Sequence, residues 1–419
     1  MRVDTFNTRW VQAMCLQAWD GCHSFGCGTW ALQHAGLSVA GGAELDQRRH
    51  ALYQSLHDNT CTDNGDVAAL VGQGMPANVA LLLLTTPCQC FSYQAKAAPL
   101  ARLDERECML PTARALAKMP WVPPMILLEN IPSMLTVPLE PGWPKGSFLQ
   151  EAVKLLRVAG YNLCMCSMCG SWSGVAQTRP RIFLCGFTNM GHLGAFLDNP
   201  PQPLAPPMAF SEVCGKGTHL WEDTRLLLTQ QGMHRLVREL QRAEQHLVDG
   251  GPVRGLDRVQ VVSPWYPNPV QCIGTKGGNV GAPGYGTYVA QVGRGDERCL
   301  RQLRSGDFKL VGEEWQPQVR ALSTQELCKL FAVTGAAAQR VCDRVAHLAE
   351  AHELFGDAVI VPHLAEVAAA MVEASGGGQR RTGTSSRGIG WMYKTTYSTI
   401  DMGSEGAPGL PHIKHNTMS

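Results

Sequence analysis

A cysteine, a glutamate and two arginines stand in sequence contexts that suit chemistry on a polar ring. Cys88 follows a proline at the end of an apolar run, and a cysteine thiolate is a strong nucleophile. Glu129 heads a Glu-Asn-Ile-Pro segment 41 residues later (129 − 88). Arg179 and Arg181 precede another apolar run; on an extended segment they share a face that suits an anion or a polar base edge. Taken singly, each set also fits a structural role, as a loop thiol, a helix N-cap and a solvated basic loop.

Short apolar runs, each ended by a polar or special residue, must position these side chains. Such runs are typical of strands buried on both faces, and helical patterns lie between them at 100–119 and 148–158. The sequence therefore predicts a doubly wound α/β domain with a mostly parallel sheet. Active residues in such a sheet lie beyond the carboxyl ends of strands, which is where Glu44, Cys88 and Glu129 fall. The predicted strands are 39–43, 79–84, 125–128 and 182–185.

Composition narrows the class of protein. The chain has 419 residues, enough for two or three domains, and 45% of them are hydrophobic, so a sizeable core is expected. A net charge of +1 argues against binding nucleic acid by charge alone but allows a local basic face. The polar start of the chain and 16 scattered cysteines indicate reduced thiols and a cytoplasmic location. No apolar run approaches the ~18 residues of a membrane span.

The pattern changes after Phe187, and a proline-rich linker follows at 199–207. From 225 to 309 we count 12 Lys and Arg against 7 Asp and Glu, a local excess of +5. This stretch contains a glycine-rich segment, 274–286, that suits either a surface loop or a close approach to a groove. The α/β pattern then resumes, before a final low-complexity run that begins at 375 and is typical of disorder.

The cysteine, glutamate and Gln-x-Arg-x-Arg sets, in this order, resemble the motifs of the DNA (cytosine-5) methyltransferase family. The likeness covers about 15–187 and 318–374. It implies a Rossmann-like, S-adenosylmethionine-dependent methyltransferase fold. A catalytic domain at 1–187 would be completed by 318–374, with a smaller target recognition domain inserted at 188–317 and a disordered tail at 375–419. Further matching segments are Gly65-Asp66-Val67, Asp104-Glu105-Arg106, Gly160-Tyr161, Gly174 to Gln177, Arg320 to Ser323 and Gly356 to Val359.

The resemblance assigns roles to the four candidate catalytic residues. Cys88 adds to cytosine C6, which makes C5 electron-rich, and Glu129 contacts ring N3 and the exocyclic amine. Arg181 contacts the base carbonyl, whereas Arg179 anchors the loop and a neighbouring phosphate. The implied substrate is double-stranded DNA with the target cytosine flipped out of the stack.

The resemblance also implies a site for S-adenosylmethionine. Glu44 accepts the ribose hydroxyls, as an acid does in related nucleotide sites, and Asp66 takes the adenine amine. Phe25 and Leu45 sandwich the adenine, and Pro87 lines the pocket. The other residues expected to bind the cofactor are Gly26, Val67, Asp357 and Val359.

Two departures from the family concern this cofactor site. The family's first motif is Phe-x-Gly-x-Gly-Gly, but the matching stretch, 22–28, has Ser24 and Cys27 at glycine positions. Asp357 stands where the family has asparagine. Both departures bear on cofactor affinity more than on the chemical step.

No metal site is expected. Cys164, Cys166 and Cys169 have a spacing that superficially suits a metal. They alternate along a predicted strand without a nearby histidine pair, and a tetrahedral zinc site needs four ligands.

Three interpretations of the function stay open. The first is an active, monomeric DNA enzyme of a restriction-modification system, phage or prophage; a cognate restriction endonuclease in the host is then the partner to look for. The second is a tRNA cytosine-5 methyltransferase, since one such family shares these motifs; the long region between Phe187 and Trp315 favours DNA. The third is a DNA-binding protein that has lost its cofactor, against which the intact catalytic motifs argue.

Overall fold

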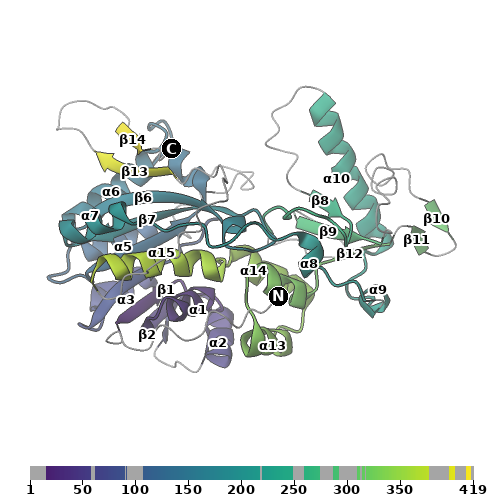
Figure 1. Cartoon of the computed structure of the whole chain (residues 1–419), viewed down its shortest axis with the longest axis horizontal. Coiled ribbons are helices and arrows are strands. Elements are labelled where there is room, and N and C mark those ends of the chain that lie inside the picture. The colour runs from purple at the N-terminus through teal and green to yellow at the C-terminus, as the bar shows by residue number, and fades with distance from the viewer. Residues whose placement is uncertain are drawn as a thin grey trace. The chain divides into compact units, whose positions relative to one another are not determined.

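The computed structural model divides into two compact units, drawn as ribbons in Figure 1. The first unit comprises 1–168, 180–202 and 361–419, and the second comprises 169–179 and 203–360. Within them, the structure describes residues 16–57, 62–89, 91, 107–217, 219–248, 259–273, 286–291, 309–311, 314–316, 318–376, 396–401 and 412–416.

One sheet forms the centre of the first unit, with the strand order β14-β13-β6-β7-β5-β4-β1-β2-β3. β1 pairs in parallel with β2 and with β4, and the β2–β3 and β4–β5 pairs are also parallel. β7 runs antiparallel to β5. The mostly parallel sheet predicted from the apolar runs is thus confirmed. The strands are β1 (Gln17–Gly21), β2 (Ser38–Glu44), β3 (Thr62–Asn64), β4 (Val79–Leu84), β5 (Met125–Asn130), β6 (Asn162–Cys169), β7 (Pro180–Phe187), β13 (Thr396–Asp401) and β14 (His412–Asn416).

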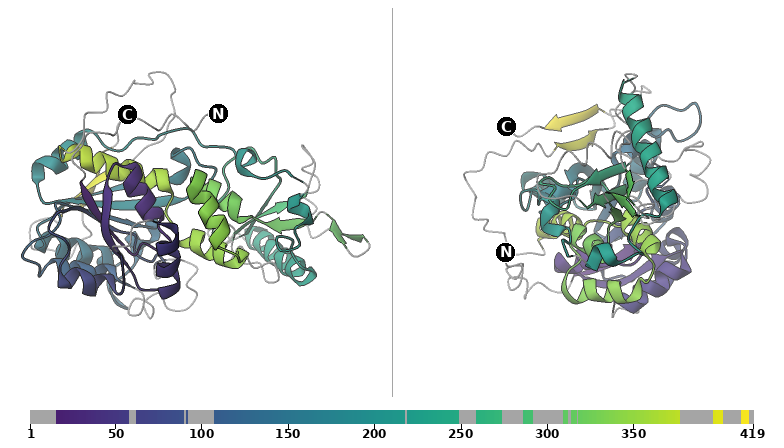
Figure 2. Two further views of the ribbon diagram at one scale, coloured as in Figure 1. Left: turned by 90° about the horizontal axis from the view of Figure 1, so that it is seen from below. Right: turned by 90° about the vertical axis from the view of Figure 1, so that its right-hand side faces the viewer.

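Helices cover both faces of this sheet. α3, α5 and α6 pack one beside the next, and α1, α15 and α7 form a second set. Figure 2 shows the two sets on opposite faces of the sheet, which is the doubly wound arrangement. The helices are α1 (Cys27–His34), α2 (Gln47–Leu56), α3 (Val67–Gln73), α5 (Met109–Leu116), η3 (Pro132–Thr136), α6 (Ser147–Val158), α7 (Met190–Asp198) and α15 (Val361–Ala374).

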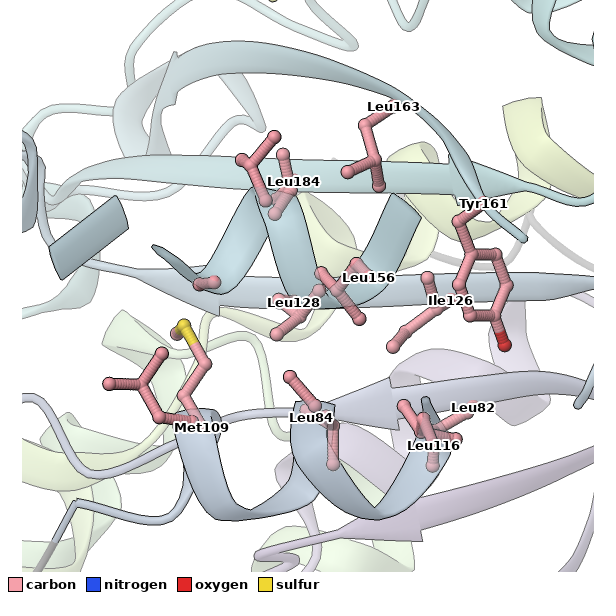
Figure 3. Close-up of a cluster of buried hydrophobic side chains, with 14 of the residues drawn as sticks. Leu82, Leu84, Met109, Leu116, Ile126, Leu128, Leu156, Tyr161, Leu163 and Leu184 are labelled. Carbon is pink, nitrogen blue, oxygen red and sulfur yellow. The ribbon is translucent and has the colours of Figure 1, made fainter. Parts of the chain in front are cut away.

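The central strands are apolar because both of their faces are covered. Every residue of β4 is buried. Figure 3 shows Leu82 and Leu84 of this strand near Leu116 of α5, and Leu128 of β5 near Leu156 of α6. Burying one leucine side chain contributes about 1.5–3 kcal/mol to stability, so a run of four leucines is a strong determinant of this strand.

The segment Leu348–Ala374 is long and apolar enough, by length and composition alone, to cross a membrane. Its most apolar window is 89% buried inside the fold. In the first unit, α15 packs against α1 and α7, and His363 lies edge-on to Phe183 with ring centroids 5.0 Å apart. Burial within the fold therefore accounts for the apolar character of this segment.

A three-stranded sheet and an amphipathic helix form the core of the second unit. β9 (Gly286–Ala290) pairs in parallel with β8 (Val259–Val262) and antiparallel with β12 (Val319–Ala321). Met233, Leu236 and Leu240 lie on one face of α10 (Gln230–Val248) and pack with residues of this sheet, as their i, i+3, i+7 spacing predicts. The other elements are η4 (Gly170–Trp172), α8 (Phe210–Val213), α9 (His219–Glu222), β10 (Lys309–Val311), β11 (Glu314–Gln316), α12 (Thr324–Leu330), α13 (Gly335–Arg344) and α14 (Leu348–Asp357).

A buried ion pair fixes the segment after β12 within the second unit. Arg320 Nη1 lies 2.7 Å from Glu326 Oε2, and Nη2 lies 2.8 Å from Oε1. Glu326 also accepts the N–H of Gly215 at 2.7 Å. Residues 318–360 are part of this unit, and residues 188–202 are part of the first. The predicted division into a catalytic domain and a target recognition domain stays a prediction. β13 and β14 lie within the predicted disordered tail.

Candidate active site

The strand order places a topological switch point at the carboxyl edge of the first unit's sheet. The chain runs from β1 to β2 and β3 on one side, then returns to β4 on the other side of β1. Such a reversal leaves a crevice outside the carboxyl ends of the two strands. A hydrogen bond connects the segments that follow β1 and β4, because Thr85 Oγ1 donates to the carbonyl oxygen of Cys22 at 3.0 Å. Cys88 lies three residues beyond Thr85 and is half-buried.

Glu129 and Arg181 form an ion pair at the same edge. Because β7 runs antiparallel to β5, its first residues lie beside the last residues of β5. Arg181 Nε lies 2.6 Å from Glu129 Oε1, and each side chain is 7% exposed. Among the described residues Oε1 accepts no hydrogen bond, so the contact is mainly electrostatic. This pair can offer both an acceptor and a donor to a polar ring.

Asn130 couples the glutamate to the cysteine loop, a role that the sequence analysis missed. Its Nδ2 donates to the carbonyl oxygen of Thr86 at 3.2 Å and to Thr86 Oγ1 at 2.9 Å. Farther along, Ser133 Oγ donates to the carbonyl oxygen of Phe91 at 2.7 Å, and Phe91 N–H donates to that of Cys88 at 3.0 Å. The sequence did contain a signal for this role, because Asn130 is a side-chain amide at the end of an apolar strand, next to the candidate acid Glu129.

The Arg179 side chain donates hydrogen bonds to backbone carbonyls within the second unit. Its side chain donates to the carbonyl oxygens of Gly356 at 2.8 Å, Ala358 at 2.6 Å and Ile273 at 3.3 Å. The residue is 1% exposed, and its guanidinium lies over the ring of Phe331. These contacts anchor two chain segments. They differ from the predicted phosphate contact, because a buried guanidinium presents no surface to a phosphate.

Glu44 and Leu45 are two of the residues that the sequence predicts for cofactor binding. Glu44 ends β2, and its carboxylate accepts the N–H of Ser24 at 2.8 Å and of Asp46 at 3.0 Å. It is half-exposed, and each carboxylate oxygen has a further lone pair to offer. Leu45 is 70% exposed, which is unusual for a leucine and suits the predicted contact with a flat ring.

Asp66 and Pro87 are also exposed on this unit. Asp66 caps α3, and its Oδ1 accepts the N–H of Ala68 at 2.8 Å; its second oxygen leaves acceptor capacity for an amine. Val67 is 3% exposed and belongs to the apolar core. The Val67 side chain therefore has a structural role in α3. Only the backbone of Val67 could contact the cofactor.

Phe25 does not lie where the sequence analysis expects it. The ring is fully buried and packs edge-to-face on Trp30, with centroids 6.1 Å apart, so it offers no surface to an adenine. The neighbouring Gly26 has φ +104°, and a Cβ there would lie 1.9 Å from Nε2 of His57. The pattern contained a phenylalanine next to a glycine, but it could not show that the ring turns inward.

The turn after β1 holds two non-glycine residues in a left-handed conformation. Cys22 and Ser24 have φ values of 63° and 51°, a left-handed conformation that is costly for non-glycine residues. The hydrogen bond from Ser24 N–H to Glu44 offsets part of that cost. Beneath the turn, burial raises the pKa of Asp20 from 3.8 to about 7, although Thr29 donates to its carboxylate at 2.8 Å. Burial also lowers the pKa of His23 from 6.5 to about 4.

Asp357 and Val359 lie in the second unit. Asp357 is the last residue of α14, and Val359 follows in the link toward α15 and is 6% exposed. Their predicted role in the cofactor site stays a prediction. In the described ranges, no group of three or more His, Cys, Asp or Glu side chains could hold a metal ion; Cys164 and Cys166 are fully buried.

Residues 19–210 match the family described as C-5 cytosine-specific DNA methylase. A curated relative, the type II methyltransferase M.NgoPII of Neisseria gonorrhoeae, is 25% identical over 164 residues. This alignment covers 39% of the chain and 46% of the relative, so the chain spans about half the length of that relative.

Solved structures share the fold over most of the chain. The S. pombe Dnmt2 methyltransferase is 13% identical with a TM-score of 0.61, over 85% of this chain and 98% of that one. A Spodoptera frugiperda DNMT2 variant is 15% identical with a TM-score of 0.62, over 85% and 99%. Together with the family match, these likenesses confirm the Rossmann-like fold predicted from the sequence. The segment 19–210 therefore belongs, by sequence, to the C-5 cytosine-specific DNA methylase family.

Proposed function

We propose that this protein transfers a methyl group from S-adenosylmethionine to C5 of cytosine in double-stranded DNA. The observation that carries the proposal is the group at the carboxyl edge: the Glu129–Arg181 pair at 2.6 Å, with Asn130 tying it to the Cys88 loop. The family match over 19–210 and the type II methyltransferase relative support it.

The chain's residues would act on the flipped base in turn. The Cys88 thiolate forms a bond to C6, and the ring electrons shift toward C5 and N3. Glu129, beside N3 and the exocyclic amine, stabilises the ring as its charge changes, and Arg181 donates to the base carbonyl. After C5 has gained its methyl group, the C5 proton leaves to a base, the C6–S bond breaks, and the thiolate is restored.

The residues on the cofactor side fit S-adenosylmethionine. The half-exposed Glu44 carboxylate suits two ribose hydroxyls, the exposed Leu45 offers an apolar face for adenine, and Asp66 has an oxygen for the adenine amine. When bound, this cofactor supplies an electrophilic methyl group. Glu44, Asp66 and Leu45 would bind and orient the cofactor. Pro87 directly precedes Cys88 and would line the same site.

A basic helix face supports a nucleic-acid substrate. On α10, the apolar face packs in the core, whereas His234, Arg235 and Arg238 are exposed. Cationic side chains of this kind contact phosphates without reading sequence. A type II setting, as in the name of the Neisseria relative, would add a cognate endonuclease as partner in the cytoplasm.

The test measures tritiated methyl incorporation from S-adenosylmethionine into duplex DNA and, separately, into tRNA. We expect incorporation into DNA that Cys88→Ser abolishes, while the matched Cys169→Ser, another half-buried thiol, keeps it. Cofactor affinity, measured by calorimetry, should be nearly equal in all three proteins. Wild-type turnover in the Cys88→Ser variant would overturn the assignment of the nucleophile. Incorporation into tRNA alone would overturn the DNA substrate.

A further inference from the structure

Two thiols meet beside the candidate site, and neither has a role in the reaction proposed above. The sulfur atoms of Cys22 and Cys108 lie 3.4 Å apart, although the residues are separated by 86 positions. Cys22 is the first residue after β1, and Cys108 is the N-cap of α5. Both are half-buried. The contact therefore joins the turn of the cofactor motif to the first turn of a helix on one face of the sheet.

Hydrogen bonds hold the backbone on both sides of this contact. The carbonyl oxygen of Cys22 accepts the Thr85 hydroxyl at 3.0 Å. That of Cys108 accepts the N–H of Thr112 at 3.0 Å and its hydroxyl at 2.6 Å. A disulfide bond is about 2.05 Å long, so the sulfurs need to approach by roughly 1.4 Å. Side-chain rotation can supply such a movement while the backbone stays in place.

The contact lies beside the candidate site, close in sequence to the Cys88 loop. Thr85, which is bonded to Cys22, stands three residues before Cys88. The hydrogen bond with Cys108, burial, and the nearby charge of Glu44 together raise the pKa of Cys22 well above its ordinary value of 9.0. Because thiolates are the reactive form, we expect the pair to oxidise slowly at neutral pH and faster at alkaline pH.

We propose that Cys22 and Cys108 are an oxidisable pair that forms an intramolecular disulfide and thereby lowers the affinity of the site for S-adenosylmethionine. A peroxide is the oxidant: it converts one thiol to a sulfenic acid and releases water. The second thiol attacks that sulfur, the S–S bond forms, and a second water leaves. The net change is the loss of two hydrogens from the protein and the reduction of one peroxide to two waters.

The bond would act on the site through the turn after β1. It would enclose the segment from 22 to 108, which includes Glu44, Asp66 and Cys88. The turn that carries Ser24, whose N–H holds the Glu44 carboxylate at 2.8 Å, would then be fixed to α5. The part of the inference that concerns cofactor affinity rests on the proposed function, whereas formation of the disulfide does not.

The experiment treats the full, reduced chain with hydrogen peroxide at pH 7 and pH 9, then alkylates, digests and maps it by mass spectrometry. We expect a linked peptide pair that contains residues 22 and 108, formed faster at pH 9 and removed by dithiothreitol. Cys22→Ala and Cys108→Ala should each abolish it, whereas Cys169→Ala should not. Thermal melting checks that every variant is folded. Absence of the linked pair in folded wild type, or earlier oxidation of the buried cysteines 164, 166 and 185, would overturn the proposal.

Calorimetry with S-adenosylmethionine separates the two proposals. We expect at least tenfold weaker binding after oxidation, full recovery with dithiothreitol, and no change in oxidised Cys108→Ala. Equal affinity before and after complete crosslinking would overturn the effect on the site while the disulfide stands. A reduced wild-type protein that forms the linked pair but binds no S-adenosylmethionine would overturn the proposed function instead.

Discussion

Replacing Glu129 with glutamine should lower both stability and rate, for separable reasons. Glu129 and Arg181 lie 2.6 Å apart with 7% of each side chain exposed. Removing one partner of a buried pair costs about 3–5 kcal/mol, because the remaining charge is left uncompensated. Glutamine keeps the shape and an acceptor oxygen, which returns about 0.5–1.5 kcal/mol as a hydrogen bond. Arg181 also keeps its bond to the Pro180 carbonyl oxygen at 2.8 Å. We therefore expect a loss of about 1.5–4.5 kcal/mol.

A double-mutant cycle in urea unfolding tests this reasoning. Arg181→Met should destabilise by a similar amount, since it leaves the carboxylate unpaired. The double variant should lose less than the sum of the two, with a coupling of about 1–3 kcal/mol. Separately, the single-turnover rate of Glu129→Gln should fall by about 10²-fold or more, the scale of a positioned acid–base group. Additive stabilities would refute the ion pair, and an unchanged rate would make Glu129 purely structural.

Three further outcomes are expected. Burial raises the pKa of Asp20 from 3.8 to about 7, so the stabilising contribution of this group is present below pH 3.8 and is lost as the pH rises through 7. Asp20→Asn should therefore raise Tm more at pH 8 than at pH 5. An equal shift of Tm at both pH values would contradict this. Arg179→Lys should destabilise the protein by about 2–4 kcal/mol in urea but leave the salt dependence of DNA binding unchanged, because the guanidinium faces carbonyls; a shallower salt slope would restore the phosphate role. Asn130→Ala should lower the methyl-transfer rate with unchanged cofactor affinity, since it releases Thr86 from β5; an unaltered rate would show that the tie does not position Cys88.

The strands were predictable because burial on both faces leaves a continuous apolar signature. The run 79–84 coincides with β4, and the run 125–128 extends in β5 to Asn130. The extension was hidden by the polarity of Glu129 and Asn130, which remain in the strand because β7 pairs with them. Of the helix predicted at 100–119, the structure describes α5 at Met109–Leu116, and residues 100–106 lie outside the described residues.

Partners of single side chains were less predictable, since they come from distant segments. Periodicity gives Arg179 and Arg181 the same face, but only the fold decides what that face meets. Arg181 meets Glu129 in the first unit, whereas Arg179 reaches carbonyls at 273, 356 and 358. The inward turn of Phe25 likewise depends on Trp30 and His57, which no local pattern connects.

The Gln-x-Arg-x-Arg segment therefore combines a structural role with a position in the candidate active site. Gln177 accepts the N–H of Ile273 at 2.9 Å and donates to the carbonyl oxygen of Leu330 at 3.3 Å, so it holds the same segment as Arg179. Only Arg181 stands beside a candidate catalytic group. A side chain that satisfies buried carbonyls is as costly to replace as one that touches substrate, because the lost bonds leave polar groups unpaired. A specific motif can thus identify the fold through two of its residues and the chemistry through the third, and activity loss alone cannot separate these roles.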